Sequence, residues 1–273
     1  MMSVDGPKAS VVMASNSSVD DVAPALEALL SQTYRNLEIV FVLDRPADEA
    51  EQDGFRSRYP GVVFEFLGAV HRLPTALNAG IRRATGTVIV RCDDDDICDP
   101  ARVERQVELL LRDGLDFVCS QAWGKRPGDN DGWLIDCPPD DAAIKAALEE
   151  RNIIVHSSLV GLKSSFETLG LYNPAFTRAQ DYELYLRAIR SGCRFGAVQA
   201  PLVTRFYPDT SITVKHRKNQ IMFSFAAQVL HAAHKNDMGY LLGKVSHYMS
   251  LLMTPNFARA LKRRVDLIKK KGR

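Results

Sequence analysis

The sequence predicts an α/β protein in which a mostly parallel sheet is sandwiched by helices. From residue 9 onward, short β-branched runs alternate with longer amphipathic stretches, as they do when parallel strands are joined by crossover helices. The chain has 273 residues, of which 46% are hydrophobic and 25% charged, which is typical of a globular protein with one main core. From residue 215 to the end the pattern is helical, which predicts a small C-terminal helical extension.

The first part of the chain contains four units in which a strand is followed by a helix. The expected strands are residues 10–14, 38–43, 62–67 and 87–92, and the expected helices are residues 19–33, 47–59, 73–84 and 100–113. Asp99 is the expected N-cap of the last helix, because Pro100 would then occupy the first helical position, which proline favours.

After Gly114 the alternation of strand-like and helix-like segments becomes irregular, which is typical of an α+β arrangement. The expected strands are residues 116–121, 133–137, 158–162, 194–198 and 202–206, and the expected helices are residues 140–150 and 182–191. We therefore expect one main domain over residues 1–212 and a helical extension over residues 213–273.

Composition and charge argue against several classes of protein. The five cysteines show no Cys-x-x-Cys spacing, which gives no indication of a disulfide framework or a zinc knuckle and favours a reducing compartment. No apolar run approaches the roughly 18 residues of a membrane span, and the N-terminus lacks a signal-peptide core, so we expect a cytoplasmic protein. Residues 259–273 carry a net charge of +7, which leaves residues 1–258 at −5 and argues against nucleic-acid binding.

Ligands of open parallel sheets bind beyond the carboxyl ends of the strands. After the first predicted strand, Ala14-Ser15-Asn16 shows no glycine-rich dinucleotide fingerprint, and the chain contains no G-x-x-x-x-G-K-[ST] stretch. The sequence therefore argues against NAD, FAD and P-loop nucleotide chemistry.

Four consecutive carboxylates, Asp93 to Asp96, follow the fourth predicted strand. Two unit charges 4 Å apart repel by about 1 kcal/mol in water and by about 4 kcal/mol at an effective dielectric constant near 20. Asp93 and Asp95 point to the same side of an extended backbone, so one can reach a divalent metal and the other a ligand hydroxyl or a metal-bound water. The alternative is a solvated acidic loop before the next helix, and the position at a strand end favours the metal.

Asp181 and His156 are two further candidates. Asp181 lies in the first turn of a predicted amphipathic helix, whose N-terminus stabilises the ionised form, so it can act as a base. The alternative is a helix-start residue without a catalytic role. His156 follows an apolar run, where a lone histidine is more often a structural group than a ligand.

The order and spacing of several motifs over residues 9–208 resemble the family 2 glycosyltransferases of the GT-A fold. The matching segments are the opening strand and loop at residues 10–16, Gln32-Thr33-Tyr34, Leu77-Asn78-Ala79-Gly80, the D-x-D motif at Asp93-Asp94-Asp95, His156-Ser157-Ser158, Gln180-Asp181 and the closing strand at Pro201-Leu202-Val203.

This resemblance implies a GT-A type, Rossmann-like sheet and a metal-dependent, inverting transfer of a sugar. The donor would be a nucleoside diphosphate sugar, with UDP as the nucleotide, and the acceptor a carbohydrate or lipid-linked hydroxyl in surface polysaccharide or glycolipid synthesis. Asp181 would be the general base, Asp95 the ligand of Mn²⁺ or Mg²⁺, and His156 and Gln180 the acceptor-binding residues. The residues implied to bind the donor are Ala14, Ser15, Asn16, Asp44 at the base, Asn78, Asp93 at the ribose, Asp94, and Arg205 at the phosphates.

Three positions depart from the family pattern. Ser15 replaces a common aromatic residue, Gln180 replaces an acid, and Tyr207 stands where a histidine is often found. A nucleotide-sugar-binding protein that has lost activity and serves as a scaffold is the alternative from another class. A nucleotidyltransferase, the third candidate, would require a glycine-rich first loop with a basic residue, and residues 14–18 have neither.

The residue pattern of the C-terminal tail, residues 257–271, predicts that it binds a membrane surface. Phe257, Leu261, Val265 and Ile268 recur at helical spacing among basic residues. Basic amphipathic helices lie on anionic membrane surfaces, where each basic residue contributes up to about 1 kcal/mol. The alternative is that this stripe packs on the protein itself. The first interpretation predicts a peripheral protein on the inner face of the membrane, close to a lipid-linked acceptor.

Overall fold

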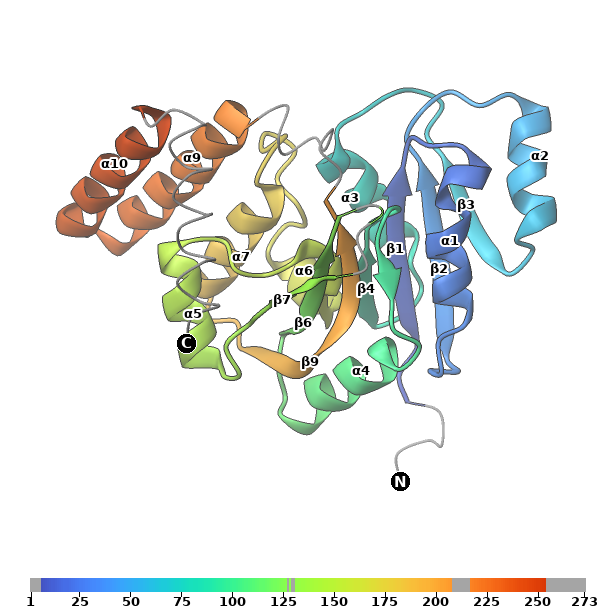
Figure 1. The fold of residues 1–273 in the computed structure, drawn as a ribbon, viewed down its shortest axis with the longest axis horizontal. Helices are drawn as coiled ribbons and strands as arrows, with labels where there is room; N and C mark the ends of the chain where they lie inside the picture. The colour runs from blue at the N-terminus through green and yellow to red at the C-terminus, as the bar shows by residue number, and fades with distance from the viewer. Residues whose placement is uncertain (1–5, 127, 129–130, 208–216, 254–273) are drawn as a thin grey trace.

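The computed structural model describes residues 6–126, 128, 131–207 and 217–253, and in this part of the chain nine strands form one sheet (Figure 1). The strand order is β3-β2-β1-β4-β8-β6-β9-β5, with β7 paired to β6 outside this path. The run β3-β2-β1-β4 is parallel, as is the long β6-β9 pair. The antiparallel pairs are shorter. The predicted mostly parallel α/β sheet is confirmed.

The first half of the sheet follows the predicted strand–helix units closely. Its elements are β1 (Ala9–Ser15), α1 (Val19–Leu30), β2 (Leu37–Leu43), α2 (Glu49–Arg58), β3 (Val62–Phe66), α3 (Leu73–Arg83) and β4 (Val88–Cys92). Every residue of β1 and β4 is buried, as expected for strands that are covered on both faces.

The second half is the irregular part. Its elements are β5 (Ile97–Cys98), α4 (Arg102–Arg112), β6 (Phe117–Lys125), β7 (Trp133–Ile135), α5 (Asp141–Glu150), a 3₁₀ turn (His156–Ser158), β8 (Val160–Leu162), α6 (Lys163–Thr168), α7 (Gln180–Arg190) and β9 (Phe195–Phe206). The sequence did not predict β5 and α6, because elements this short show no clear period.

Two sequence predictions in this half are wrong in detail. Helix α4 begins at Arg102 with Ala101 as its N-cap, and Asp99 Oδ1 instead accepts a hydrogen bond from the Ala101 N–H at 2.9 Å in the preceding turn. The two strands predicted over residues 194–198 and 202–206 are one strand, β9 (Phe195–Phe206), whose pairing with β6 shifts in register after Ser120. One irregular strand therefore replaces the expected pair.

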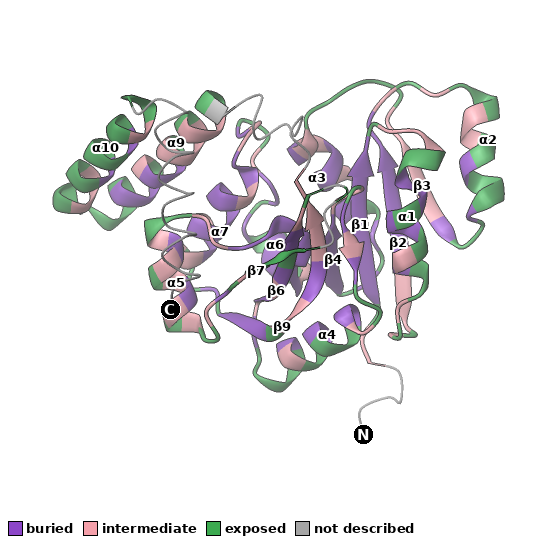
Figure 2. Ribbon diagram, in the orientation of Figure 1, coloured by how far each residue is buried: buried purple, intermediate pink, exposed green. Residues whose placement is uncertain are grey.

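Helices cover both faces of the sheet because alternate residues of each strand point to opposite sides. Val12 and Ala14 of β1 pack in a hydrophobic cluster with α3, α5, α6 and α7. Val11 and Met13 pack in a second cluster with α1, α2 and α4. The purple strands at the centre of Figure 2 show this double coverage.

Helices α9 (Arg217–Lys235) and α10 (Met238–Met253) form a hairpin attached to the C-terminal end of α5 (Figure 1). Gln228 Nε2 and the Tyr240 hydroxyl donate to the carbonyl oxygen of Glu149 at 3.0 and 2.7 Å. A carbonyl in the last turn of a helix lacks an intrahelical partner, so these side chains cap α5. The division into domains 1–212 and 213–273 stays a prediction.

The predicted amphipathic tail, with Phe257 to Ile268, lies outside the described residues. Within the described part of the chain, none of the helices combines the length and the hydrophobicity that crossing a membrane requires.

Gly80 sets the distance between α3 and the sheet. A Cβ atom at this position would lie 2.6 Å from Cγ1 of Val12 and 3.0 Å from Cγ2 of Val42. Both valines are buried, and β-branched side chains have few alternative rotamers, so neither can move aside easily. Close packing of helix on sheet therefore requires the glycine of the Leu-Asn-x-Gly motif.

We predict that Gly80→Ala lowers the free energy of unfolding by about 1 to 3 kcal/mol, because overpacking outweighs the gain in helix propensity. Gly54→Ala is the matched control, since Gly54 lies in α2 and no atom of the described residues would lie within 4 Å of an added Cβ. It should gain up to about 1 kcal/mol. Urea denaturation followed by circular dichroism measures both changes, and an equal effect of the two substitutions would contradict the prediction.

Candidate active site

The acidic run lies in the turn between β4 and β5, at the carboxyl edge of the parallel strands. Because β1 pairs with both β2 and β4, the ends of these three strands are adjacent. The Asp44 N–H donates to the carbonyl oxygen of Ser15 at 2.7 Å, which joins the ends of β2 and β1. The structure therefore brings Ser15, Asp44 and Asp93, three of the predicted donor-binding residues, to one edge of the sheet.

Asp93 is paired with a buried arginine of β4, the strand that it follows. The Arg91 side chain is 2% exposed, and its Nη2 donates to Asp93 Oδ1. Burial alone would raise the pKa of Asp93, but the charges of Arg91 and Arg205 lower that pKa below its ordinary value. Sequence reasoning missed Arg91, whose only signal is a cation in an otherwise apolar strand. Its charge keeps Asp93 ionised.

Asp94 turns toward the first strand. The Ser15 hydroxyl donates to Asp94 Oδ2, and the Ser17 Oγ lies 3.4 Å from the same oxygen. The Ser17 N–H in turn donates to Ser15 Oγ at 2.9 Å. Burial raises the pKa of Asp94, and the hydrogen bond from Ser15 opposes this rise. Ser15 thus ties the acidic turn to the loop after β1.

Loss of solvation, and then the charges of neighbouring carboxylates, raise the pKa of the remaining two carboxylates. Asp95 is exposed, but the neighbouring protein atoms reduce its solvation and raise its pKa to about 6. The charges of Asp93 and Asp94 raise this pKa further. Burial, and then the charge of Asp93, raise the pKa of Asp96 to about 8. Asp96 Oδ2 accepts a hydrogen bond from the Ser157 hydroxyl, and the buried Oδ1 has no hydrogen-bond partner among the described residues. At neutral pH the raised pKa favours the protonated form of Asp96, whereas Asp95, with a pKa of about 6, still carries most of its negative charge.

This negative charge fits a divalent cation. Asp95 presents an exposed carboxylate next to two others, and Mg²⁺ and Mn²⁺ prefer such oxygen ligands. Among the described residues, no group of three or more His, Cys, Asp or Glu side chains is arranged to hold a metal by itself. Mg²⁺ commonly binds one or two carboxylates together with waters and substrate phosphates. The residues therefore fit an ion whose coordination a bound diphosphate completes.

His71 is a neighbour of the site that sequence reasoning missed. Asp44 Oδ1 accepts a hydrogen bond from the His71 N–H at 2.8 Å and lies 3.0 Å from its ring Nδ1. His71 follows the turn at Gly68, whose φ of +69° suits glycine. The contact orients the Asp44 carboxylate at the sheet edge, and the sequence contains no signal for it beyond the position of His71 after a strand.

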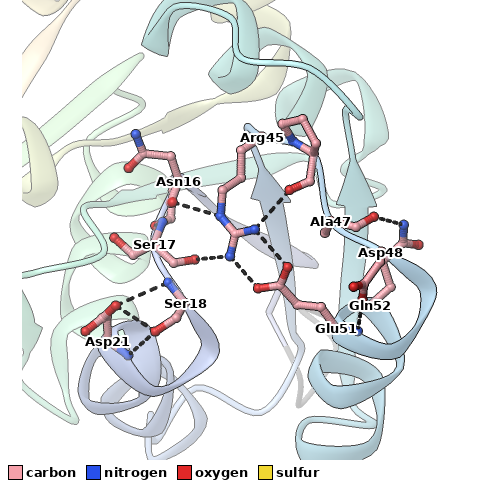
Figure 3. A network of polar contacts seen from close by, with 11 residues as sticks. Asn16, Ser17, Ser18, Asp21, Arg45, Ala47, Asp48, Glu51 and Gln52 are labelled. Atoms are coloured by element: carbon pink, nitrogen blue, oxygen red, sulfur yellow. Dashed lines mark hydrogen bonds and ion pairs between the residues drawn. The ribbon is translucent and has the colours of Figure 1, made fainter.

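Arg45 fixes the loop after β1 (Figure 3). Its guanidinium donates to the carbonyl oxygens of Asn16 and Ser17 at 2.9 and 3.3 Å, and its Nη1 donates to Glu51 Oε2 at 2.8 Å. The side-chain amide of Asn16 is exposed and points away from these contacts. The Ala14 side chain is buried in the core, so only its backbone can approach a ligand. Sequence reasoning missed Arg45 beside Asp44.

His156 and Asn78 are buried and meet at Tyr172. The His156 Nε2 lies 2.8 Å from the Tyr172 hydroxyl, and burial lowers the pKa of His156 to about 3. Asn78 Nδ2 donates to the Tyr172 carbonyl at 2.8 Å, and Asn78 Oδ1 accepts from the Tyr172 N–H at 2.9 Å. These contacts hold the segment that leads to α7. Ligand contacts by His156 and Asn78 stay predictions.

Asp181 lies in the first turn of α7, after a residue with a left-handed backbone. Ala179 has a φ of +51°, a conformation that costs a non-glycine residue about 1 to 3 kcal/mol. The Asn152 amide donates to Asp181 Oδ2 at 2.7 Å. Burial raises the pKa of Asp181 and outweighs the hydrogen bonds that lower it. The backbone of Tyr182 at the helix start lowers the pKa of Asp181, which is the predicted direction, but burial is the larger effect. The role of Asp181 as a base stays a prediction. Gln180, just before it, is buried.

Arg205 on β9 interacts electrostatically with both the acidic turn and α7. Burial would lower the pKa of Arg205, but Tyr207, Asp93, Asp96 and Asp181 raise it above its ordinary value. The Arg205 guanidinium carbon lies 5.0 Å from the centroid of the Tyr207 ring. Arg205 is thus a cation shared by the candidate metal site and the candidate base.

The family described as "Glycosyl transferase family 2" matches residues 10–170 of the chain. This region runs from β1 to just beyond α6, and it contains the acidic turn with its neighbours at the sheet edge. The match covers more than half of the chain.

Two curated relatives show how far the similarity extends. An uncharacterized glycosyltransferase of Methanocaldococcus jannaschii is 23% identical over 98% of this chain and 96% of its own length. The UDP-Gal:alpha-D-GlcNAc-diphosphoundecaprenol beta-1,3-galactosyltransferase of Escherichia coli is 27% identical over 77% of this chain and 78% of its own length. The chain spans only 34% and 42% of two longer Rickettsia glycosyltransferases.

Solved structures share the fold at low sequence identity. S. aureus TarS 1–349 in complex with UDP-GlcNAc has a TM-score of 0.68 and 12% identity, and the match covers 87% of this chain and 72% of that chain. The mannosyltransferase PcManGT from Pyrobaculum calidifontis in complex with GDP-Man and Mn²⁺ has a TM-score of 0.59 and 18% identity, and the match covers 96% of this chain and 80% of that chain. The GT-A type sheet predicted from the sequence is confirmed.

We predict that Arg91→Met lowers the free energy of unfolding by about 3 to 5 kcal/mol, because it leaves the charge of Asp93 without its buried partner. Arg105→Met on the exposed side of α4 is the control and should change the free energy by less than about 0.5 kcal/mol. Urea denaturation measures both. Two changes of similar size would show that Arg91 does not compensate Asp93.

Proposed function

The chain belongs to glycosyl transferase family 2, and we propose that it is a glycosyltransferase of the metal-dependent, inverting kind. The donor we propose is a nucleoside diphosphate sugar with UDP as the nucleotide. The acceptor is a hydroxyl on a carbohydrate or a lipid-linked sugar, in the synthesis of a surface polysaccharide or glycolipid.

The observation that supports this reaction most is that an acidic turn, an arginine and a further aspartate lie close enough at one edge of the sheet to interact electrostatically. The acidic turn follows β4, Arg205 lies on β9, and Asp181 begins α7. The charges of Asp93 and Asp181 both act on Arg205, and Asp93 and Asp181 act on each other. A cation-binding turn within electrostatic reach of a carboxylate base suits sugar transfer from a diphosphate leaving group.

The ends of β1, β2 and β4 suit the donor. We propose that the nucleotide binds next to Asp44 and Ser15. Asp93, which Arg91 keeps ionised, would then accept a hydrogen bond from a ribose hydroxyl. Asp95 would hold Mn²⁺ or Mg²⁺, which neutralises negative charge growing on the diphosphate. The Mn²⁺ in PcManGT supports a divalent metal, and UDP-GlcNAc in TarS and the UDP-Gal named for the E. coli relative support UDP.

Asp181 supplies the base in this proposal. An aspartate whose pKa is raised by burial accepts a proton more readily than an exposed one while it remains a carboxylate. It would take the proton of the acceptor hydroxyl as that oxygen attacks the sugar on the face opposite the diphosphate. Arg205 would contact the phosphates, and Gln180 and His156 would position the acceptor.

We also propose that the C-terminal hairpin holds the enzyme at an anionic membrane surface, on the cytoplasmic side. Exposed apolar side chains recur on α10 at Met238, Leu242, Val245 and Met249, which places them along one side of the helix. The basic residues beyond α10 add charge of the right sign. The diphosphoundecaprenol named for the E. coli relative supports a lipid-linked acceptor.

The donor site is tested by calorimetric titration of the protein with UDP, with and without Mn²⁺. We predict metal-dependent binding that Asp95→Ala weakens at least about tenfold, because the mutant lacks the proposed metal ligand. Asp99→Ala, which removes an exposed carboxylate four residues further on, should bind like the wild type. No UDP binding with the metal present, or an equal loss in both variants, would contradict the donor site.

The base is tested by the pH dependence of UDP release from UDP-N-acetylglucosamine and UDP-galactose. We predict that Asp181→Asn lowers the rate by about 10² to 10⁴ while UDP binding stays intact. Activity should fall as the pH drops and Asp181 becomes protonated. Asn152→Ala removes a hydrogen bond that lowers the pKa of Asp181, so the acid limb should move to higher pH.

Asn173→Ala is the matched control for Asn152→Ala, because both amides accept a backbone N–H two residues later and only Asn152 contacts Asp181. Its pH profile should equal that of the wild type. An acid limb that stays in place in Asn152→Ala, or moves in both variants, would count against Asp181 as the titrating base.

Membrane binding is tested by sedimentation with phosphatidylglycerol vesicles. We predict that Leu242→Ser with Met249→Ser weakens binding by about tenfold or more, because two exposed apolar side chains no longer enter the lipid. Leu30→Ser on α1 removes a similarly exposed apolar side chain on another helix and should leave binding unchanged. Equal sedimentation of all three proteins would refute the role of α10.

A further inference from the structure

Two aromatic rings meet where β7 and the end of β9 come together. The ring centroids of Trp133 and Tyr207 lie 5.3 Å apart with an interplanar angle of 37°. Trp133 is 43% exposed although it is one of the largest apolar side chains of the protein, and Figure 2 shows β7 as an exposed strand in front of the buried sheet. We call the pair Trp133 and Tyr207 the aromatic platform.

Gly124 lies directly under the ring of Trp133 and so provides the surface on which this ring packs. It is the register partner of Trp133 on β7 and of Arg205 on β9, so these three residues form one row across the strands. A Cβ atom on Gly124 would lie 2.4 Å from the Trp133 ring, so the indole rests directly on the glycine backbone. The Tyr207 N–H donates to the Lys125 carbonyl at 2.8 Å, which fixes the second ring to the same strand.

The platform lies on the face of the strands that is directed at the candidate site. The next row on this face, Ala122 with Ile135 and Val203, packs against Val155, the residue before His156. Within the platform's own row, Arg205 interacts electrostatically with Asp93 and Asp181 and lies against the Tyr207 ring. The rings are therefore neighbours of the group that links the acidic turn to the proposed base.

The strand order separates this platform from the nucleotide side. Ser15 ends β1 and Asp44 directly follows β2. These two strands lie on one side of β4, whereas β6, β9 and β7 lie on the other. The acidic turn after β4 stands between them. A molecule on the platform would therefore approach the acidic turn from the side opposite the nucleotide, which is the side of an acceptor.

We propose that Trp133 and Tyr207 form a stacking site for a pyranose ring of the acceptor, an inference that rests on the proposed glycosyltransfer. One face of a pyranose presents mainly C–H groups, which pack on an aromatic ring, while its hydroxyls remain free for polar partners. An exposed indole held flat on a glycine and beside a second ring provides such a surface. Arg205, next to Tyr207, provides hydrogen-bond donors for the hydroxyls at the edge of the sugar.

The chain offers a closely matched control for this site. Trp123, the only other tryptophan, lies on the same β6-β7 ribbon and is 40% exposed. It precedes Gly124 and pairs with Leu134, so its side chain points to the opposite face of the strands. Trp123→Ala therefore removes an equally exposed indole without touching the platform.

The test is saturation-transfer NMR on the full chain with UDP and Mg²⁺, using three probes: the methyl α-glycosides of glucose, galactose and N-acetylglucosamine. We expect transfer to the C–H protons of one ring face of at least one glycoside. The signal should persist in Trp123→Ala, fall about tenfold in Trp133→Ala and return in part in Trp133→Phe. Gly124→Ala, which displaces the indole without removing it, should also weaken the signal.

Calorimetry of UDP on the same samples separates this proposal from the proposed function. If UDP binds the wild type and no glycoside gives a signal, or if Trp133→Ala retains the full signal, the platform is wrong and the donor site stands. An equal loss in Trp123→Ala and Trp133→Ala would also overturn the platform. If the glycoside signal depends on Trp133 while UDP fails to bind, the platform stands and the proposed donor site is wrong.

Discussion

The compensation of negative charge at the end of β4 is the constraint on which the rest of the site depends. Four consecutive carboxylates leave a fully buried strand, and the protein compensates only one of them with a buried cation, Arg91. Ser15 and Ser157 donate hydrogen bonds to two others, and Asp95 remains exposed with its pKa raised to about 6. Bringing these groups together requires β1 beside β4 and the 3₁₀ turn beside the acidic turn. The fold thus builds a turn whose remaining charge suits a cation and a diphosphate.

The strand order gives this turn two different sides. The parallel strands β1 and β2 present short polar residues and a well-anchored loop, fixed by Arg45. The strands β6, β7 and β9 present an arginine and two aromatic rings instead. Helix α7 brings Asp181 within electrostatic reach of the same arginine, after the strained residue Ala179. In the proposed reaction, the nucleotide would bind on the first side and a sugar of the acceptor on the second, with the proposed reacting groups between them.

The sequence predicted the ends of every element from β1 to β4 to within three residues, because strong hydrophobic periodicity is a local signal. It also located the acidic turn, since four aspartates after an apolar strand are visible without any structure. It did not predict the partners of these residues. Arg91, His71 and Arg45 act through contacts that exist only after the strands pair. The raised pKa of Asp181 has the same origin, because burial of a helix start depends on what packs around it.

The most direct test of this account is amide NMR of the ¹⁵N-labelled protein titrated with UDP and Mg²⁺. We expect shifts at the ends of β1, β2 and β4 and in the residues just after them, among them Ser15, Asp44 and Asp93, and no comparable shifts along β7. Shifts centred on Trp133 and the β6-β7 ribbon, with the ends of β1 and β2 unaffected, would contradict it, because the nucleotide would then occupy the side assigned to the acceptor.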